Sequence, residues 1–122
     1  MSYNEDEVLI DYIWWNYRGL MTDFERLVGS AVIGRLKADA AGATRMAEII
    51  RRKWGREGDP DVESALAGGP DAFRRRVAER VMAERGGDVN LNRCPKCDRI
   101  PRTPRAKQCL WCKHRWHHMP EQ

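Results

Sequence analysis

Apolar residues recur at intervals of three and four along most of the first 85 residues, a spacing that places them on one face of an α-helix. The clearest stripe predicts a helix over residues 23–38; its members are Phe24, Leu27, Val28, Ala31, Val32 and Leu36. Just before it, Thr22 and Glu25 have the spacing of a capping box, in which each side chain accepts a hydrogen bond from the backbone N–H of the other residue. The pattern therefore predicts both the start of this helix and the face that it buries.

Three shorter helices are predicted further along, over residues 43–54, 60–67 and 70–85. The first and last of them carry apolar stripes, formed by Met46, Ala47, Ile50 and Trp54 and by Phe73, Val77 and Val81. The middle helix is expected to begin at Asp59 and Pro60, because an N-cap residue followed by proline is typical of a helix start.

The segment 5–18 is also expected to be helical, but its pattern is unusual. Between Val8 and Tyr17, eight of ten residues are apolar or aromatic. A helix that is apolar on all sides is normally buried on all sides. Two interpretations stay open: a central bundle helix whose tryptophans seal its edges, or a helix whose Trp14 or Trp15 faces a partner chain.

The charge of the chain changes character near residue 88. The 122 residues carry a formal charge of +4, but residues 1–92 hold 14 Lys or Arg and 16 Asp or Glu, whereas residues 93–122 hold eight and two. The N-terminal residues lack the basic start and apolar run of a secretory signal, and no apolar run approaches the roughly 20 residues that span a bilayer. We therefore expect a cytoplasmic protein with no membrane segment and with a basic C-terminal part.

All four cysteines lie in this basic part, in the pattern C-x2-C-x11-C-x2-C; they are Cys94, Cys97, Cys109 and Cys112. Each C-x2-C turn points two sulfurs to the same side, and two facing turns supply the four ligands of a tetrahedral zinc ion. Disulfides are less expected without a secretory signal, and a redox pair would not need a second C-x2-C turn. Because four thiolates close the coordination shell, we expect one Zn²⁺ with a structural role.

The residues around the cysteines suggest the shape of the module. Residues 89–92 and 115–117 are expected to form short flanking strands, and Thr103-Pro104-Arg105-Ala106 to form the turn at the tip of a hairpin. Three histidines follow the last cysteine: His114, His117 and His118. One of them could replace a cysteine as ligand or bond to a sulfur from the surrounding shell, but the simpler interpretation is that all three are exposed.

Cys94-Pro95-x-Cys97 paired with Cys109-x-Trp111-Cys112 through a short basic loop resembles the zinc-ribbon fold group over residues 88–118. This stretch is also similar to the C-terminal end of small uncharacterised bacterial proteins, to which no activity can be attached. Zinc ribbons usually place glycine after the second cysteine of each turn, where a positive φ is convenient, and this chain has Asp98 and Lys113 there. The resemblance implies a structural zinc ion in a small β module, and such modules serve nucleic-acid machinery and protein docking alike.

Together these patterns predict a mainly α protein with a small C-terminal β zinc ribbon. A bundle of four or five helices is expected over residues 1–87, the ribbon over residues 88–118 and a tail over residues 119–122. The junction at Gly86 and Gly87 is too short to let the two parts separate far, so we expect them to pack together.

Two classes of function remain open. A set of basic side chains on and beside the predicted hairpin would bind the phosphates of DNA or RNA with low sequence specificity; the set is Arg99, Arg102, Arg105, Lys107, Lys113 and Arg115. The alternative is a protein-interaction module, as in an adaptor, a regulator or an immunity-type inhibitor, that uses Trp14 and Trp15, with self-association as a variant. No glycine-rich phosphate loop, H-E-x-x-H motif or nucleophile elbow is present, so we expect no enzyme, no catalytic residue and no small-molecule substrate.

Overall fold

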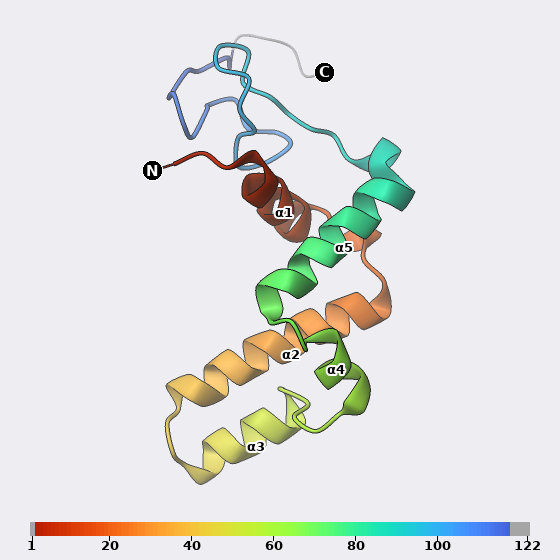
Figure 1. Cartoon of the computed structure of the whole chain (residues 1–122). Coiled ribbons are helices and arrows are strands. Elements are labelled where there is room, and N and C mark those ends of the chain that lie inside the picture. Colours follow the sequence, from red (N-terminus) through yellow and green to blue (C-terminus); the bar gives the residue numbers. More distant parts are fainter. Residues whose placement is uncertain (1, 118–122) are drawn as a thin grey trace. The chain divides into compact units, whose positions relative to one another are not determined.

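The structure is a computed structural model that describes residues 2–117, and helices dominate it (Figure 1). The α-helices are α1 (Glu5–Asn16), α2 (Asp23–Ala40), α3 (Arg45–Lys53), α4 (Pro60–Ala65) and α5 (Pro70–Arg85). Short 3-10 turns follow α1 at Arg18–Leu20 and α5 at Gly86–Asp88. The mainly α prediction is confirmed, and every predicted helix is present with both ends within two residues of those expected. Within the described part, no helix has the length and apolar character needed to cross a bilayer.

The described residues form two compact units. One unit is Met21–Val77 and holds α2, α3, α4 and the start of α5. The other joins residues 2–20 to residues 78–117, so that α1 belongs with the later part of α5 and with the cysteine-rich segment. The N-terminal residues therefore contribute to the surroundings of the cysteines.

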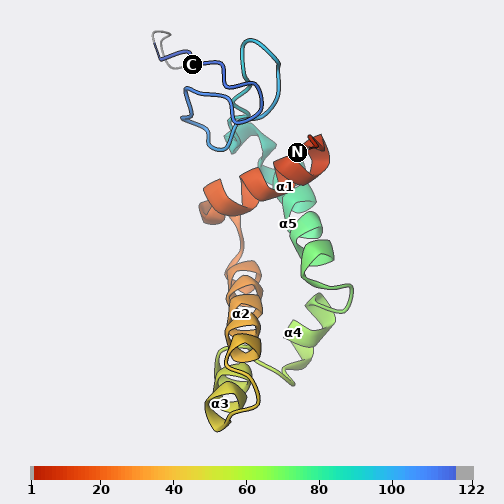
Figure 2. The ribbon, with the colours of Figure 1, turned by 90° about the vertical axis from the view of Figure 1, so that its left-hand side faces the viewer.

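Helices α2 and α3 lie side by side in the unit Met21–Val77 (Figures 1 and 2). The predicted capping box starts α2: the Thr22 hydroxyl accepts from the Glu25 N–H at 3.1 Å, and the Glu25 carboxylate accepts from the Thr22 N–H at 2.8 Å. Further along α2, Gly34 meets the chain that leaves α3. A Cβ atom at Gly34 would lie 2.7 Å from the backbone carbonyl carbon of Trp54, so this close approach requires glycine.

The buried face of α2 differs from the predicted stripe. Val28 and Ala31 are buried as expected, but Phe24 is 43% exposed and Leu36 is 62% exposed. The small residue Gly34 is buried in their place. The prediction followed the spacing of apolar residues, whereas the close contact with the end of α3 selects glycine, which that spacing does not count.

The stripes predicted for α5 and α3 have different outcomes. The α5 stripe is buried as predicted; its members are Phe73, Val77 and Val81. On the α3 stripe, Ala47 is buried, but Met46 and Trp54 are each 61% exposed. The unit Met21–Val77 therefore has a buried core but leaves several large apolar side chains of α2 and α3 exposed.

Helix α1 lies next to the cysteine-rich segment of its own unit (Figures 1 and 2). Ile13 is completely buried and Trp14 is 5% exposed, whereas Trp15 is 59% exposed. The nearly uninterrupted apolar pattern of this helix is therefore explained mainly by burial inside the unit. Only one of the two tryptophans that were considered for a partner chain reaches the surface.

The cysteine-rich segment is built from turns. Residues 2–117 contain no β-strand, so the strands expected at residues 89–92 and 115–117 are not found and a β ribbon is not shown. One isolated antiparallel bridge joins Gln108 to Arg115. The predicted turn is present, since the Ala106 N–H donates to the Thr103 carbonyl at 3.2 Å. Side-chain and turn hydrogen bonds replace the expected strand ladder here.

Candidate metal centre

The first C-x2-C turn is closed by three hydrogen bonds around Cys94. The Asp98 N–H donates to the Cys94 carbonyl at 2.8 Å, and the Cys94 N–H donates to the Arg99 carbonyl at 2.9 Å. The Lys96 N–H points at the Cys94 sulfur at 3.4 Å. These hydrogen bonds hold both the backbone of the turn and the Cys94 sulfur in place.

The second C-x2-C turn repeats this pattern residue by residue. The Lys113 N–H donates to the Cys109 carbonyl at 3.1 Å, and the Cys109 N–H donates to the His114 carbonyl at 2.8 Å. The Trp111 N–H points at the Cys109 sulfur at 3.3 Å. Two turns with the same hydrogen bonds face each other, as expected of a pair that shares one metal ion.

The residue after the second cysteine of each turn has a left-handed backbone. The φ angle is +63° at Asp98 and +66° at Lys113. Positive φ is the conformation that glycine favours, and it strains residues that carry a Cβ atom. The structure therefore shows at both positions the conformation for which zinc ribbons usually use glycine.

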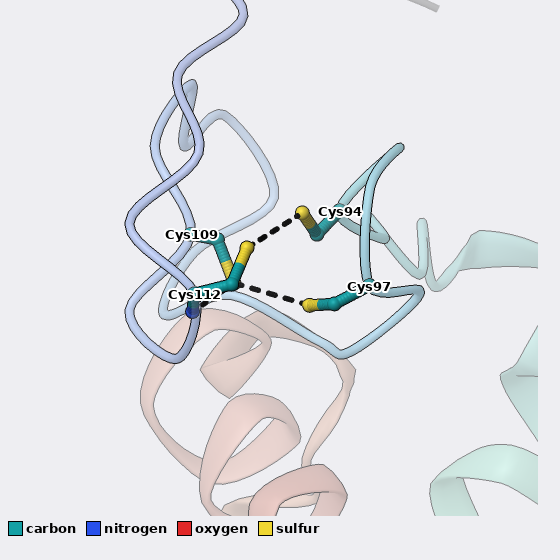
Figure 3. Close-up of side chains that lie close together, drawn as sticks. All are labelled: Cys94, Cys97, Cys109 and Cys112. Atoms are coloured by element: carbon teal, nitrogen blue, oxygen red, sulfur yellow. Dashed lines mark hydrogen bonds between the residues drawn. The ribbon is translucent and has the colours of Figure 1, made fainter.

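The four sulfurs converge on one point (Figure 3). Cys94 lies 3.6 Å from Cys112, and Cys97 lies 3.6 Å from Cys109, measured between sulfurs. All four sulfurs lie within 4.8 Å of one another. A tetrahedral site with metal–sulfur bonds of about 2.3 Å requires sulfur–sulfur separations of about 3.8 Å. The four cysteines are therefore positioned to bind one metal ion.

The first cysteine of each turn is buried away from solvent. Cys94 is 2% exposed and Cys109 is completely buried, and both belong to a cluster with the buried Trp116. The partly buried Trp111 and the other two cysteines pack against this cluster. A closed thiolate shell inside an apolar wrapping suits a structural ion, because no open position is left for water.

The thiols differ in how readily they lose a proton. Burial raises the pKa of the Cys97 thiol. Burial also acts to raise the pKa of Cys109, but the N–H groups of Cys112 and Trp111 donate to its sulfur and, with the neighbouring thiols, lower its pKa. A metal ion binds thiolates, so it must displace the proton that the raised pKa of Cys97 retains. Metal binding is therefore expected to weaken as the pH falls.

The histidines are separate from the sulfur cluster. Within residues 2–117, the group that could hold a metal ion consists of the four cysteines and includes neither His114 nor His117. The His114 ring stacks on Trp116 with ring centroids 6.0 Å apart, and its side chain is half-buried. His117 is exposed, and His118 lies outside the described residues.

Sequence reasoning missed the role of the N-terminal tyrosines, which hold the cysteine-rich segment. The buried Tyr12 donates its hydroxyl to the Asn90 carbonyl at 2.5 Å, and Tyr17 accepts from the Asn90 N–H at 2.9 Å. Tyr3 accepts from the Ile100 N–H at 3.1 Å. Burial raises the pKa of Tyr12 to about 12, so its hydroxyl keeps its proton throughout the ordinary pH range. The available signal was that all three tyrosines of the chain lie within its first 17 residues.

Two more contacts join the N-terminal residues to the cysteine-rich segment. The Glu5 carboxylate accepts from the Arg93 guanidinium at 2.8 Å, and this hydrogen bond lowers the pKa of Glu5. The Tyr3 ring meets the Trp111 indole edge to face, with centroids 4.9 Å apart. Packing between Trp111 and the N-terminal part agrees with the expectation that the basic segment packs on the helical part.

The predicted basic set lies mostly at the surface. Its exposed members are Arg99, Arg102, Arg105, Lys113 and Arg115, and Lys107 is half-buried. Arg99 lies over the Tyr3 ring at 5.2 Å. None of the five exposed members forms a side-chain ion pair with another residue of the described range 2–117. Their positive charges are therefore available to an external ligand.

Comparison with known proteins adds no relative to this picture: no family model, curated protein or solved structure matches the chain.

Proposed function

We propose that the four cysteines hold one structural Zn²⁺, that this ion folds residues 88–118 into a module of the zinc-ribbon type, and that the module binds nucleic acid mainly through phosphate contacts. The protein has no enzymatic role in this proposal. Zinc fits the donor set because it favours four thiolates in a closed tetrahedral shell. Iron accepts the same geometry, so the metal itself needs a direct test.

The observation that carries the nucleic-acid proposal is the set of five exposed basic side chains without an acidic partner in residues 2–117. Some arginines of the other unit are engaged in ion pairs instead. Arg51 pairs with Asp39 at 3.1 Å, and Arg35 pairs with Glu63. Basic side chains without an acidic partner in the protein can neutralise phosphates and so release the counterions condensed on a nucleic acid.

The proposal predicts low base specificity from direct groove contacts. Residues 89–117 contain no α-helix that could enter a major groove. Affinity would come from phosphate contacts, so it should fall steeply as salt concentration rises. The module would act as a general anchor on DNA or RNA.

Metal analysis of the purified protein tests the first half of the proposal. We expect one zinc per chain by elemental mass spectrometry, and loss of that zinc in Cys94→Ser and Cys109→Ser. A visible absorption band together with bound iron would overturn the assignment to zinc. Undiminished zinc in both variants would overturn the assignment of the cysteines.

Fluorescence anisotropy with a labelled oligonucleotide, measured over a salt series, tests the second half. The double variant Arg102→Glu, Arg105→Glu should bind more weakly and show a smaller salt dependence. Arg45→Glu changes an exposed charge of α3 in the other unit and serves as the control that should bind like the wild type. Absence of binding at low salt, or an equal effect of the control, would refute the proposal.

The second candidate function is protein interaction, and exposed apolar side chains favour it. In the unit Met21–Val77, the large side chains with at least two-fifths of their surface exposed are Phe24, Ile33, Leu36, Met46, Ile49 and Trp54. Exposed apolar patches often mark association sites. Light scattering over a range of concentrations distinguishes the forms of this candidate: self-association that Leu36→Lys abolishes would support it, and a monomer at every concentration would exclude a second copy as the partner.

A further inference from the structure

A cavity of about 490 Å³ lies between α1 and the cysteine-rich segment, inside one compact unit. Apolar side chains form most of its wall, among them Val8, Trp15, Ile100, Leu110 and Trp111. Its size falls within the range of about 300–1,000 Å³ that is usual for small-ligand pockets. None of the four cysteines is among the residues that line this space.

Two indoles line the cavity from different elements, Trp15 from α1 and Trp111 from the second cysteine turn. The Trp111 ring is fixed, because its Nε1–H donates to the Ile100 carbonyl at 3.2 Å and Tyr3 packs against it edge to face. Trp15 is 59% exposed. A fixed aromatic wall beside an accessible one is a suitable surface for stacking a flat ring.

Two residues that line the cavity from α1, Asp11 and Asn16, carry hydrogen-bond acceptors. The Asn16 amide donates to the Tyr12 carbonyl at 3.0 Å and to the Arg102 carbonyl at 3.2 Å, which uses both of its N–H bonds. The side-chain oxygen of Asn16 receives no hydrogen bond from residues 2–117, and Asp11 also lines the cavity. These acceptors would pair with N–H donors of a ligand.

Basic side chains on one wall of the cavity, formed by residues 100–103, could bind a negatively charged group. Arg102 lines the cavity and is exposed, and Arg99 and Arg105 lie exposed on either side of the wall segment. A ligand that combines a flat ring carrying amino groups with a flanking anion matches all three features. A nucleotide unit is that ligand.

We propose that the cavity takes one unstacked base of a single-stranded nucleic acid, while Arg102 and its neighbours contact the flanking phosphates. The inference rests on the proposed function and adds a substrate class to it. A base in a duplex is paired and stacked and cannot enter, so single strands should bind better than duplexes. Because the cavity offers acceptors, bases with an exocyclic amino group should bind better than thymine or uracil.

The experiment compares labelled oligodeoxyadenosine, oligodeoxythymidine, an abasic oligodeoxynucleotide and a duplex of the same length, each by anisotropy at several salt concentrations. We expect oligodeoxyadenosine to bind best. Trp15→Leu should weaken its binding by about 5- to 150-fold, the range for loss of one aromatic stacking contact, with little change in salt dependence. Trp15→Phe should retain most of the affinity, and binding of the abasic strand should be unaffected by either change.

Trp54→Leu is the matched control, because Trp54 is exposed to the same degree as Trp15 (61% against 59%) but lies in the other unit. It should bind all probes like the wild type, and an unchanged far-ultraviolet circular dichroism spectrum would show that each variant is folded. If the abasic strand binds as well as oligodeoxyadenosine and Trp15→Leu has no effect, the cavity inference is wrong and the phosphate-binding function stands. If no probe binds at low salt, the proposed function itself fails. Quenching of tryptophan fluorescence by an oligoarginine peptide, abolished by Trp15→Leu and absent with every oligonucleotide, would overturn the inference in favour of a protein ligand.

Discussion

The left-handed backbone at Lys113 offers a direct test of the geometry of the metal turns. Its φ is +66°, and a residue with a Cβ atom in this region costs roughly 1–2 kcal/mol relative to the right-handed conformation. Glycine avoids this cost but loses about 0.5–1 kcal/mol of additional chain entropy on folding. Lys113→Gly should therefore be more stable than Lys113→Ala by about 0.5–1 kcal/mol.

The comparison with alanine isolates the backbone effect. Lys113→Ala removes the ammonium group and the side-chain stem just as Lys113→Gly does, but it keeps the Cβ atom. Since the metal binds only the folded turn, Lys113→Gly should bind zinc about two- to fivefold more tightly than Lys113→Ala. This factor follows from the stability difference, because about 1.4 kcal/mol corresponds to a factor of ten. Competition with a chromophoric chelator measures this affinity for both variants.

The equivalent position in the first turn supplies an internal check. Asp98 has a φ of +63°, and aspartate tolerates this region better than lysine does. The gain of Asp98→Gly over wild type should therefore be smaller than that of Lys113→Gly over wild type, whereas the difference between the glycine and alanine variants should be similar at the two positions. Equal zinc affinity of Lys113→Gly and Lys113→Ala would refute the left-handed conformation, and with it the repeated turn geometry.

Three further substitutions test the packing around the two units. Gly34→Ala should destabilise the unit Met21–Val77 by about 1–3 kcal/mol in thermal unfolding, because its Cβ atom would lie 2.7 Å from backbone. Gly86→Ala should be nearly neutral, because no atom lies within 4 Å of its new Cβ. Similar effects of the two substitutions would contradict the close approach at Gly34. Glu5→Gln should lower stability at pH 7 by less than about 1 kcal/mol, since the pair with Arg93 is partly exposed. The pKa of Glu5 is lowered in the folded state, so the stabilisation is present at neutral pH and is lost as the pH falls through that pKa; a difference from wild type that persists in acid would exclude this linkage. Thr22→Ala should lower the free energy of unfolding, measured by chemical denaturation, by about 1 kcal/mol, and Thr22→Ser by much less. Equal stability of the two variants would show that the capping box contributes nothing.

The helices and the cysteine turns could be predicted because their determinants are local. The capping box at Thr22, the proline start at Pro60 and the apolar periodicity all act within a few residues, and every helix end was found within two residues of its predicted position. The spacing of the four cysteines is local in the same sense within each turn. The sequence was therefore sufficient to identify the helices and the candidate ligands of a metal ion.

The contacts that depend on distant parts of the chain could not be predicted in this way. The hydrogen bond from Tyr12 to Asn90 spans 78 residues, and that from the Ile100 N–H to Tyr3 spans 97. Periodicity identifies α1 as apolar on all sides but does not say what covers it. The burial of Gly34 on α2 was likewise missed, because its contact depends on the path of the chain after α3.

The metal centre and the cavity share a residue, and this makes their functions separable by experiment. Trp111 lies between Cys109 and Cys112 in the second turn, its N–H points at the Cys109 sulfur at 3.3 Å, and its indole lines the cavity. Removing the metal should loosen this turn and displace the stacking wall. The charges of Arg102 and Arg105 do not depend on the metal.

Metal removal should therefore affect the two parts of nucleic-acid binding unequally. Protein stripped of metal by a chelator should keep weak, salt-dependent binding to single strands but lose its preference for oligodeoxyadenosine over the abasic strand. Restoring zinc should restore the preference. If the stripped protein retained the preference, the cavity wall would not depend on the metal; if it lost salt-dependent binding as well, the phosphate contacts would need the folded turn too. The structure predicts loss of the preference with retention of weak binding. The cysteine turn positions Trp111, whereas phosphate attraction needs only exposed charge.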